Sequence, residues 1–210
     1  GVQTCALPIF ALAWLLARRD FWGKSLLDAA VHLPLVLPPV VTGYLLLLTF
    51  GKRGLVGGWL ADHLGIVFAF RWTGAALACG VMSFPLLVRP IRLSIEAVDR
   101  RLEQAAETLG AAPWRVFATV TLPLALPGVL AGMVLGFAKA IGEFGATITF
   151  VSNIPGETQT ISSAIYSLIQ TPDGDTAAAR LVIVSIVIAM GALIGAEVFA
   201  RRATARLHGQ

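Results

Sequence analysis

The sequence from Glu103 to Gly128 reads EQAAETLGAAPWRVFATVTLPLALPG and joins a charged, helix-forming run to a long apolar one. Four small or apolar residues recur at helical spacing in and just before it: Leu102, Ala105, Ala106 and Leu109. This i, i+3, i+4, i+7 pattern predicts a helix with one small apolar face. Gly110 fits the end of that helix, and Pro113 fits the first turn of a second short helix at an angle to it. The apolar face predicts either docking into a partner's groove or a partnerless helix on the membrane surface.

The composition of the whole chain sets this stretch in a membrane protein. Of its 210 residues 57% are hydrophobic and 13% are charged, whereas soluble domains carry about 25% charged residues. In a membrane protein, the Lys and Arg residues behind the formal net charge of +4 indicate which side of the membrane a loop faces. No nucleic-acid partner is expected. Cys5 and Cys79 form no ligand-spaced cluster, so neither a metal site nor a disulfide framework is expected.

Five apolar segments predict an all-α, polytopic fold of about five transmembrane helices. A helix needs about 20 apolar residues to cross the bilayer core. The predicted spans are residues 10–17, which are the remnant of a truncated first helix, 30–50, 72–88, 122–141 and 177–200. Prolines at 34, 38 and 39 predict a kink in the second span, Pro85 predicts a break in the third, and Arg89 predicts its end.

The first nine residues, GVQTCALPI, resemble the translation of a common sequencing-library adapter. We expect residues 1–9 to be an artefact of sequencing and residues 10–210 to form a single transmembrane domain. Cys5 would then not belong to the protein.

The distribution of Lys and Arg predicts the orientation of the spans. Basic residues gather at 18–24, 89–115 and 201–206, which fall on one side for five spans, and the positive-inside rule makes that side the cytoplasm. Residues 51–71 and 144–176 then face outward. The segment 144–176 mixes Gly and Pro with short apolar pieces, so it predicts a re-entrant or gate-like extracytoplasmic segment. An ordinary loop packed on the outer surface is the alternative.

Gly23-Lys24-Ser25 looks like the end of a phosphate-binding P-loop. That motif needs a glycine five residues before Gly23, and Arg18 stands there. The chain is therefore not expected to bind ATP through a P-loop, and ATP-driven work would need another subunit.

The loop at 92–121, with the Leu-Pro that follows it, resembles the signature of the integral-membrane subunits of binding-protein-dependent ABC importers. The family pattern is Glu-Ala-Ala, three residues, Gly, nine residues, an aliphatic residue, any residue and Leu-Pro. This chain matches it in register at Gln104-Ala105-Ala106, Gly110, Val120 and Leu122-Pro123, with Gln in place of the first Glu and Glu103 one residue earlier. The resemblance implies a type I ABC importer permease fold whose cytoplasmic coupling helix docks the ATPase. The implied docking residues are Glu103, Gln104, Ala105, Ala106, Gly110, Leu122 and Pro123.

Two further stretches, residues 32–44 and 142–170, resemble molybdate-type permeases. This resemblance implies a multi-pass subunit of the bacterial inner membrane that works as a homodimer, with two cytoplasmic ABC ATPase subunits and an extracytoplasmic molybdate-binding protein. It implies no catalysis and no cofactor bound by this chain, since ATP and Mg would be used by the ATPase. A permease for sulfate, thiosulfate or tungstate is an alternative. An ion-coupled secondary transporter is a more distant one, since it would predict mid-span carboxylates and internal repeats, and the sequence has neither.

A tetrahedral oxyanion crossing an apolar core needs hydrogen-bond donors that do not trap it. Candidate donors along such a path are Thr42, Ser83, Thr147, Thr149, Ser152 and Asn153. Each could equally hold two membrane helices together. Lys139 and Glu143 also count as candidates, because ionisable groups at membrane depth are often functional. Their i, i+4 spacing predicts that they pair.

Glycines at 128, 132 and 136 recur every four residues in the fourth predicted span. They predict a smooth face for close helix approach. The approaching helix could belong to the same subunit or lie across a dimer axis.

Overall fold

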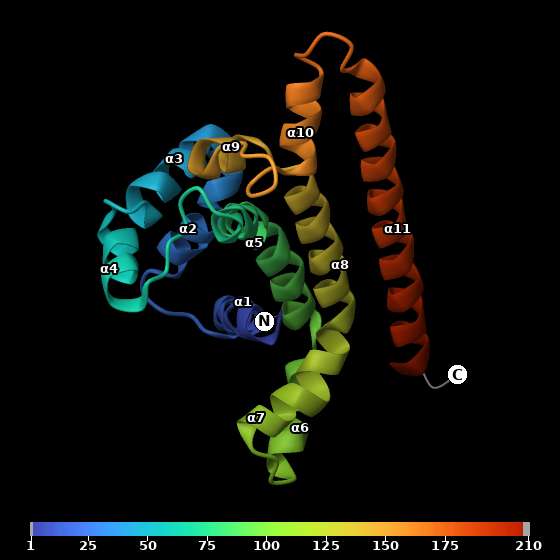
Figure 1. Ribbon diagram of the computed structural model, residues 1–210. Helices are drawn as coiled ribbons and strands as arrows, with labels where there is room; N and C mark the ends of the chain where they lie inside the picture. The colour runs from blue at the N-terminus through green and yellow to red at the C-terminus, as the bar shows by residue number, and fades with distance from the viewer. Residues whose placement is uncertain (1, 208–210) are drawn as a thin grey trace. The chain divides into compact units, whose positions relative to one another are not determined.

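The computed structural model describes the backbone of residues 2–207 and the side chains of residues 8–195 and of Val198. Within this part of the chain all regular structure is helical (Figure 1). The side chains of residues 1–7, Cys5 among them, and those of the basic tail at 201–206 lie outside the described part of the chain.

The chain forms two compact units, which are described separately. The first comprises Gly1–Asp28, Leu86–Gly136 and Gly191–Gln210; the second comprises Ala29–Pro85 and Phe137–Met190. Three long helices, α5, α8 and α11, contribute residues to both. The expected single transmembrane domain over 10–210 stays a prediction.

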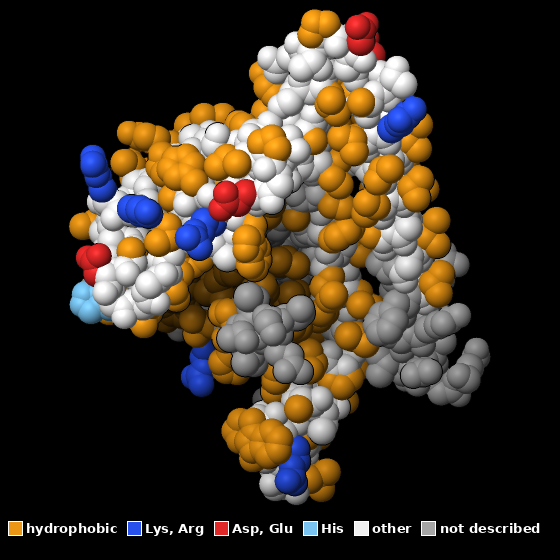
Figure 2. All heavy atoms as spheres, in the orientation of Figure 1, with side chains coloured by type: hydrophobic (Ala, Val, Ile, Leu, Met, Phe, Trp, Pro, Cys, Tyr) orange, Lys and Arg blue, Asp and Glu red, His pale blue; other side chains and the backbone are white. Residues whose placement is uncertain are grey.

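Within the described residues, three single helical segments are long and apolar enough to cross a membrane. They are α5 (Trp72–Ala97), the continuous run Pro113–Ile141, and Asp175–Gly195 within α11 (Asp175–Leu207). In α11 only 6% of the apolar window is buried, and hydrophobic side chains cover the visible part of this helix (Figure 2). Such a surface suits lipid rather than water.

The first predicted span corresponds to the end of α1 (Val2–Arg18), where Pro8–Arg18 is a shorter apolar helix. The second is not one kinked helix as predicted but two, α2 (Lys24–Val36) and α3 (Pro39–Phe50), bent by 116°. Pro38 and Pro39 explain the break, since prolines donate no backbone hydrogen bond and disfavour helical backbone before them.

Helix α5 is longer than predicted, because Pro85 does not break it and Arg89 does not end it. The Pro85 ring is fully buried, so surrounding packing offsets the single backbone hydrogen bond that proline removes. Beyond Arg89, Arg92 donates to Glu96 in the same helix and to Asp28, each at 2.8 Å. These ion pairs let a charged segment continue the helix to Ala97.

The loop after α5 also differs from the prediction of two short helices. Helix α6 (Arg100–Thr108) is present and ends before Gly110, whose φ of +86° suits glycine. Pro113 begins α7 (Pro113–Val116) as expected, but α7 continues through the π-helical turn η1 (Phe117–Thr121) into α8 (Leu122–Ile141). The wider π turn accommodates Pro123, which has no N–H to donate, so Leu122-Pro123 lies inside a continuous helix.

The two segments that the sequence predicts to face outward contain three short helices. Helix α4 (Leu55–Leu64) follows α3, and α9 (Gly145–Val151) and α10 (Ile161–Leu168) lie within the segment 144–176. The segment 144–176 is therefore partly helical, and its role as a gate stays a prediction.

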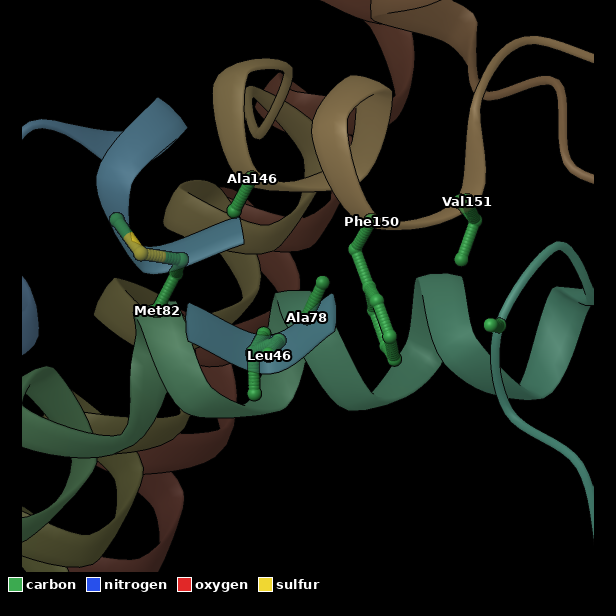
Figure 3. Close-up of a cluster of buried hydrophobic side chains, with 7 residues drawn as sticks. Leu46, Ala78, Met82, Ala146, Phe150 and Val151 are labelled. Atoms are coloured by element: carbon green, nitrogen blue, oxygen red, sulfur yellow. The ribbon is translucent and has the colours of Figure 1, made fainter. Parts of the chain in front are cut away.

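The second unit has its core where α3, α5 and α9 meet. Leu46 from α3, Ala78 and Met82 from α5, and Phe150 from α9 are buried together there. Figure 3 shows Phe150 reaching from α9 towards α5. Gly43 makes the approach of α3 and α9 possible, because a Cβ at this position would lie 2.5 Å from the Ala146 carbonyl oxygen.

In the first unit α8 packs on α5 through the glycine face. A Cβ at Gly128 would lie 2.5 Å from the Pro90 carbonyl oxygen, and one at Gly132 would lie 3.0 Å from the Leu87 carbonyl oxygen. The side chain of Leu87 covers Gly136 in the same way. The glycine repeat predicted from the sequence therefore serves helix packing within one subunit.

Replacing Gly128 by Ala should destabilise the protein by about 1–3 kcal/mol, because the added methyl overpacks the α5–α8 contact. Thermal unfolding of the purified protein in detergent measures the effect. Gly191→Ala in α11 is the control, since a Cβ there meets nothing within 4 Å. Equal melting temperatures for the two variants would show that the close contact does not hold these helices together.

Candidate functional site

Helix α6 begins with a strong local signal. The Asp99 carboxylate caps it by accepting a hydrogen bond from the backbone N–H of Arg101 at 2.9 Å. Glu103 lies in the first turn, where a negative charge interacts favourably with the helix dipole. The cap and the dipole together fix where the helix starts and hence which residues share a face.

Apolar side chains on α6 and just after it are exposed. Leu102 is 50% exposed and Leu109 is 89% exposed, while Trp114 at the start of α7 is 68% exposed. Gln104 and Ala105 are also exposed, and Ala106 is half-buried. An apolar face of this kind, at the end of the segment that the sequence places in the cytoplasm, is suited to a protein partner.

Glu103 points the other way. Its Oε1 atom accepts from Arg18 Nη2 at 3.0 Å and from Thr121 Oγ1 at 2.6 Å. The Arg18 side chain is 8% exposed and that of Glu103 is 17% exposed. The carboxylate of Glu103 is therefore engaged inside the first unit, and the exposed polar position beside it is the neutral amide of Gln104. Of the other predicted docking residues, Gly110 is exposed, whereas Leu122 and Pro123 are half-buried in the continuous helix.

A cavity of about 230 Å³ lies beside this ion pair. Its lining includes the pair itself, Thr121 and the exposed Gln104, together with Trp14, Arg19, Arg100, Glu107 and Phe117. Asp20 follows α1 near these basic residues, and the Lys24 ammonium that hydrogen-bonds to it, with a smaller contribution from Arg100, lowers the pKa of this exposed carboxyl.

The second unit contains the polar residues that the sequence suggested as donors along an anion path, and they fall into two groups. The Thr147 hydroxyl donates to the Phe144 carbonyl at 2.9 Å and that of Thr149 donates to the Gly145 carbonyl at 2.8 Å, so both are used within α9. Ser152 follows α9 with a positive φ of 66° and is exposed. Asn153 donates to Ser167 Oγ at 2.6 Å.

Thr42 and Ser83 form the second group. Thr42 is 5% exposed and Ser83 is 4% exposed, and neither hydroxyl has a hydrogen-bond partner within the described part of the chain. A buried hydroxyl without a partner is costly and therefore unusual. Both stay candidates for an anion path, and Thr42 also lines a cavity; sequence spacing could not distinguish these two hydroxyls from the others.

Lys139 and Glu143 form the pair that their spacing predicts, with Lys139 Nζ donating to Glu143 Oε2. The Glu143 side chain is 1% exposed, and its Oε1 atom also accepts from the Ala146 N–H at 2.9 Å. Glu143 thus joins the end of α8 to the start of α9. Its contacts give it a structural role in positioning α9.

The sequence reasoning missed an apolar cavity of about 380 Å³ in the second unit. Pro34, Leu37, Thr42, Leu45 and Val81 are among the residues that line it. The cavity lies at the bend between α2 and α3, so the Pro38-Pro39 pair is the sequence feature that could have indicated it. Among the described residues no group of three His, Cys, Asp or Glu side chains could hold a metal ion.

Comparison with known proteins places this geometry in a family. Residues 9–205 match the family described as "Binding-protein-dependent transport system inner membrane component". The chain belongs to this family. It is accordingly a permease subunit located in the inner membrane, and it is not an enzyme.

Three bacterial relatives are similar over most of the chain. The molybdenum transport system permease protein ModB of Escherichia coli K12 is 65% identical over 90% of this chain and 82% of its own length. The ModB protein of Haemophilus influenzae is 58% identical over 96% of this chain and 87% of its own. The sulfate transport system permease protein CysT of Escherichia coli is 38% identical over 87% of this chain and 65% of its own.

A solved structure shares the permease fold. It is a bacterial ABC transporter involved in import of the acidic polysaccharide alginate, with a TM-score of 0.69 at 20% sequence identity, covering 96% of this chain and 76% of that one. The likeness confirms the predicted ABC importer permease fold.

Replacing Lys139 by Ala should destabilise the permease by about 3 kcal/mol, because it leaves the buried Glu143 carboxylate without its counter-charge. Folded yield and melting temperature in detergent measure this. The double variant Lys139→Ala, Glu143→Gln should recover most of the loss, since the amide oxygen of Gln can still accept from Ala146 N–H. If Lys139→Ala folds normally but transport is lost, the pair has a direct role in transport instead.

Proposed function

We propose that this chain is the membrane-spanning subunit of an ATP-driven importer of molybdate. The observation that carries the proposal is the 65% identity to a molybdenum transport permease over 90% of the chain. The exposed face of α6 coincides with the family's coupling signature. Through this face such a subunit would receive energy from an ATPase.

In this proposal the exposed face of α6 docks into a cleft of a cytoplasmic ABC ATPase, which binds and hydrolyses ATP with Mg. Two copies of the permease would each hold one ATPase subunit, and an extracytoplasmic binding protein would deliver the anion. A solved relative of the same fold is a complex with a periplasmic protein, at a TM-score of 0.65 and 17% identity. The permease itself makes and breaks no covalent bond.

Neutral donors suit the passage of a dianion. A fixed, unpaired cation in an apolar core would hold molybdate in a deep electrostatic minimum and slow its release. Hydroxyls such as those of Thr42 and Ser83 provide weaker hydrogen bonds. Lys139 is already engaged by Glu143, so its charge is largely compensated.

Sulfate is the main alternative substrate, because molybdate and sulfate are both tetrahedral dianions. The identity to the sulfate permease is 38%, against 58% and 65% for the two molybdenum permeases. Uptake of radioactive molybdate into vesicles that contain the permease, its ATPase and its binding protein tests the choice. An excess of sulfate should leave uptake unchanged, whereas strong competition would favour a sulfate permease.

The substitution Thr42→Val should lower the rate of molybdate uptake by about ten-fold or more, since it removes a hydrogen bond to a charged ligand worth about 1.5–3 kcal/mol. The same change should leave the melting temperature equal or higher, because it removes a buried hydroxyl that has no partner within the described chain. Thr73→Val is the control, since the Thr73 hydroxyl donates to the Val67 carbonyl. Unchanged uptake in Thr42→Val would exclude this hydroxyl from the path.

A further inference from the structure

A single carboxylate oxygen connects several segments of the first unit. Glu103 Oε1 on α6 accepts from Arg18 at the end of α1 at 3.0 Å and from Thr121 at the end of η1 at 2.6 Å. Arg18 also donates from Nη2 to the carbonyl of Val98, just beyond α5, at 3.2 Å. Thr121 is 1% exposed and the side chains of Arg18 and Glu103 are 8% and 17% exposed, so this cluster is largely buried and borders the cavity described above.

Helix α6 has little else to hold it. None of its nine residues, Arg100–Thr108, is buried, and its apolar residue Leu102 is half exposed. Gly110, with a positive φ, lies just beyond the helix, and Ala112 has extended backbone. Without the Glu103 contacts, the helix could pivot on its two flanking connections.

We infer that Glu103 is a positioning residue that locks α6 to the end of α1 and to η1. A displacement imposed on α6 is then passed directly to the membrane span Pro113–Ile141, to which η1 belongs. This inference rests on the proposed function, because it assumes that an ATPase moves α6. It assigns Glu103, one residue before the signature, to the interior of the permease, and it leaves the neutral Gln104, which stands where the family has Glu, for the partner's cleft.

The chemistry of the contact suits transmission of force. A buried ion pair with a second hydrogen bond has one favourable geometry and resists sliding, whereas exposed apolar contacts tolerate shifts. Thr121 closes the π-helical turn, and such turns often occur at functional sites. The contact therefore acts on the span at a point where its helical geometry already changes.

The test uses the complex of permease, ATPase and binding protein in vesicles, and measures the molybdate transported for each ATP hydrolysed. Glu103→Gln keeps the size of the side chain and removes its charge. It should lower this ratio by about ten-fold, a typical strength for coupling between two sites. The amount of ATPase recovered with the permease should stay close to that of the wild type.

Thr121→Val is a second, milder variant that removes only the other donor to the same oxygen. It should lower the amount of molybdate transported for each ATP hydrolysed by about three-fold, which is weaker than typical coupling between two sites. Glu96→Gln is the matched control, because Glu96 pairs with Arg92 inside one helix at 2.8 Å and joins no second segment through that bond. Its ratio should equal that of the wild type.

The double variant Glu103→Gln, Gln104→Glu restores the family's acidic residue at the exposed position. It should remain uncoupled, because the bonds to Arg18 and to Thr121 are both made from position 103. Recovery of the wild-type ratio would overturn the inference, since the charge would then act at the ATPase. A normal ratio with less recovered complex in Glu103→Gln and Thr121→Val would also overturn it. Failure of the wild-type complex to import molybdate would instead contradict the proposed function.

Discussion

The interior of a bilayer offers no water to backbone amides, and this constraint governs the described part of the chain. A helix meets this constraint because its backbone N–H and C=O groups bond to one another. Proline interrupts this pattern, because it has no backbone N–H to donate. The chain treats prolines in three ways: it bends by 116° at Pro38-Pro39, it packs Pro85 completely, and it widens into a π turn before Pro123. Each treatment sets the direction of a membrane segment.

Local features were predictable from the sequence because their causes are local. The helical period around Ala105, the ending at Gly110 and the start at Pro113 all depend on neighbouring residues. The Lys139–Glu143 pair follows from i, i+4 spacing alone. The apolar spans follow from length and composition, and α8 has the predicted bounds. The end of α5 and the continuity of α8 with α7 were not predictable in this way, because ion pairs extend α5 and a π turn joins α7 to α8.

Contacts between distant residues were not predictable in this way. Arg18 and Glu103 are 85 positions apart, so nothing near Glu103 indicates that it points inward while Gln104 points outward. The hydrogen bonds of the threonine hydroxyls were not predictable from the sequence either. The sequence does not distinguish Thr42 from Thr147 as a candidate donor. The fold shows that the Thr147 hydroxyl donates to the Phe144 carbonyl, whereas the Thr42 hydroxyl is buried and has no partner in the described chain.

In the proposed mechanism a docking helix is joined to a membrane span through one buried carboxylate, and ATP is the source of energy for transport of molybdate. The direct test is molybdate accumulation in vesicles that hold the complete complex, with ATP supplied or withheld on the ATPase side. Accumulation against a gradient is expected only when ATP is present. Accumulation that persists without ATP would contradict this mechanism.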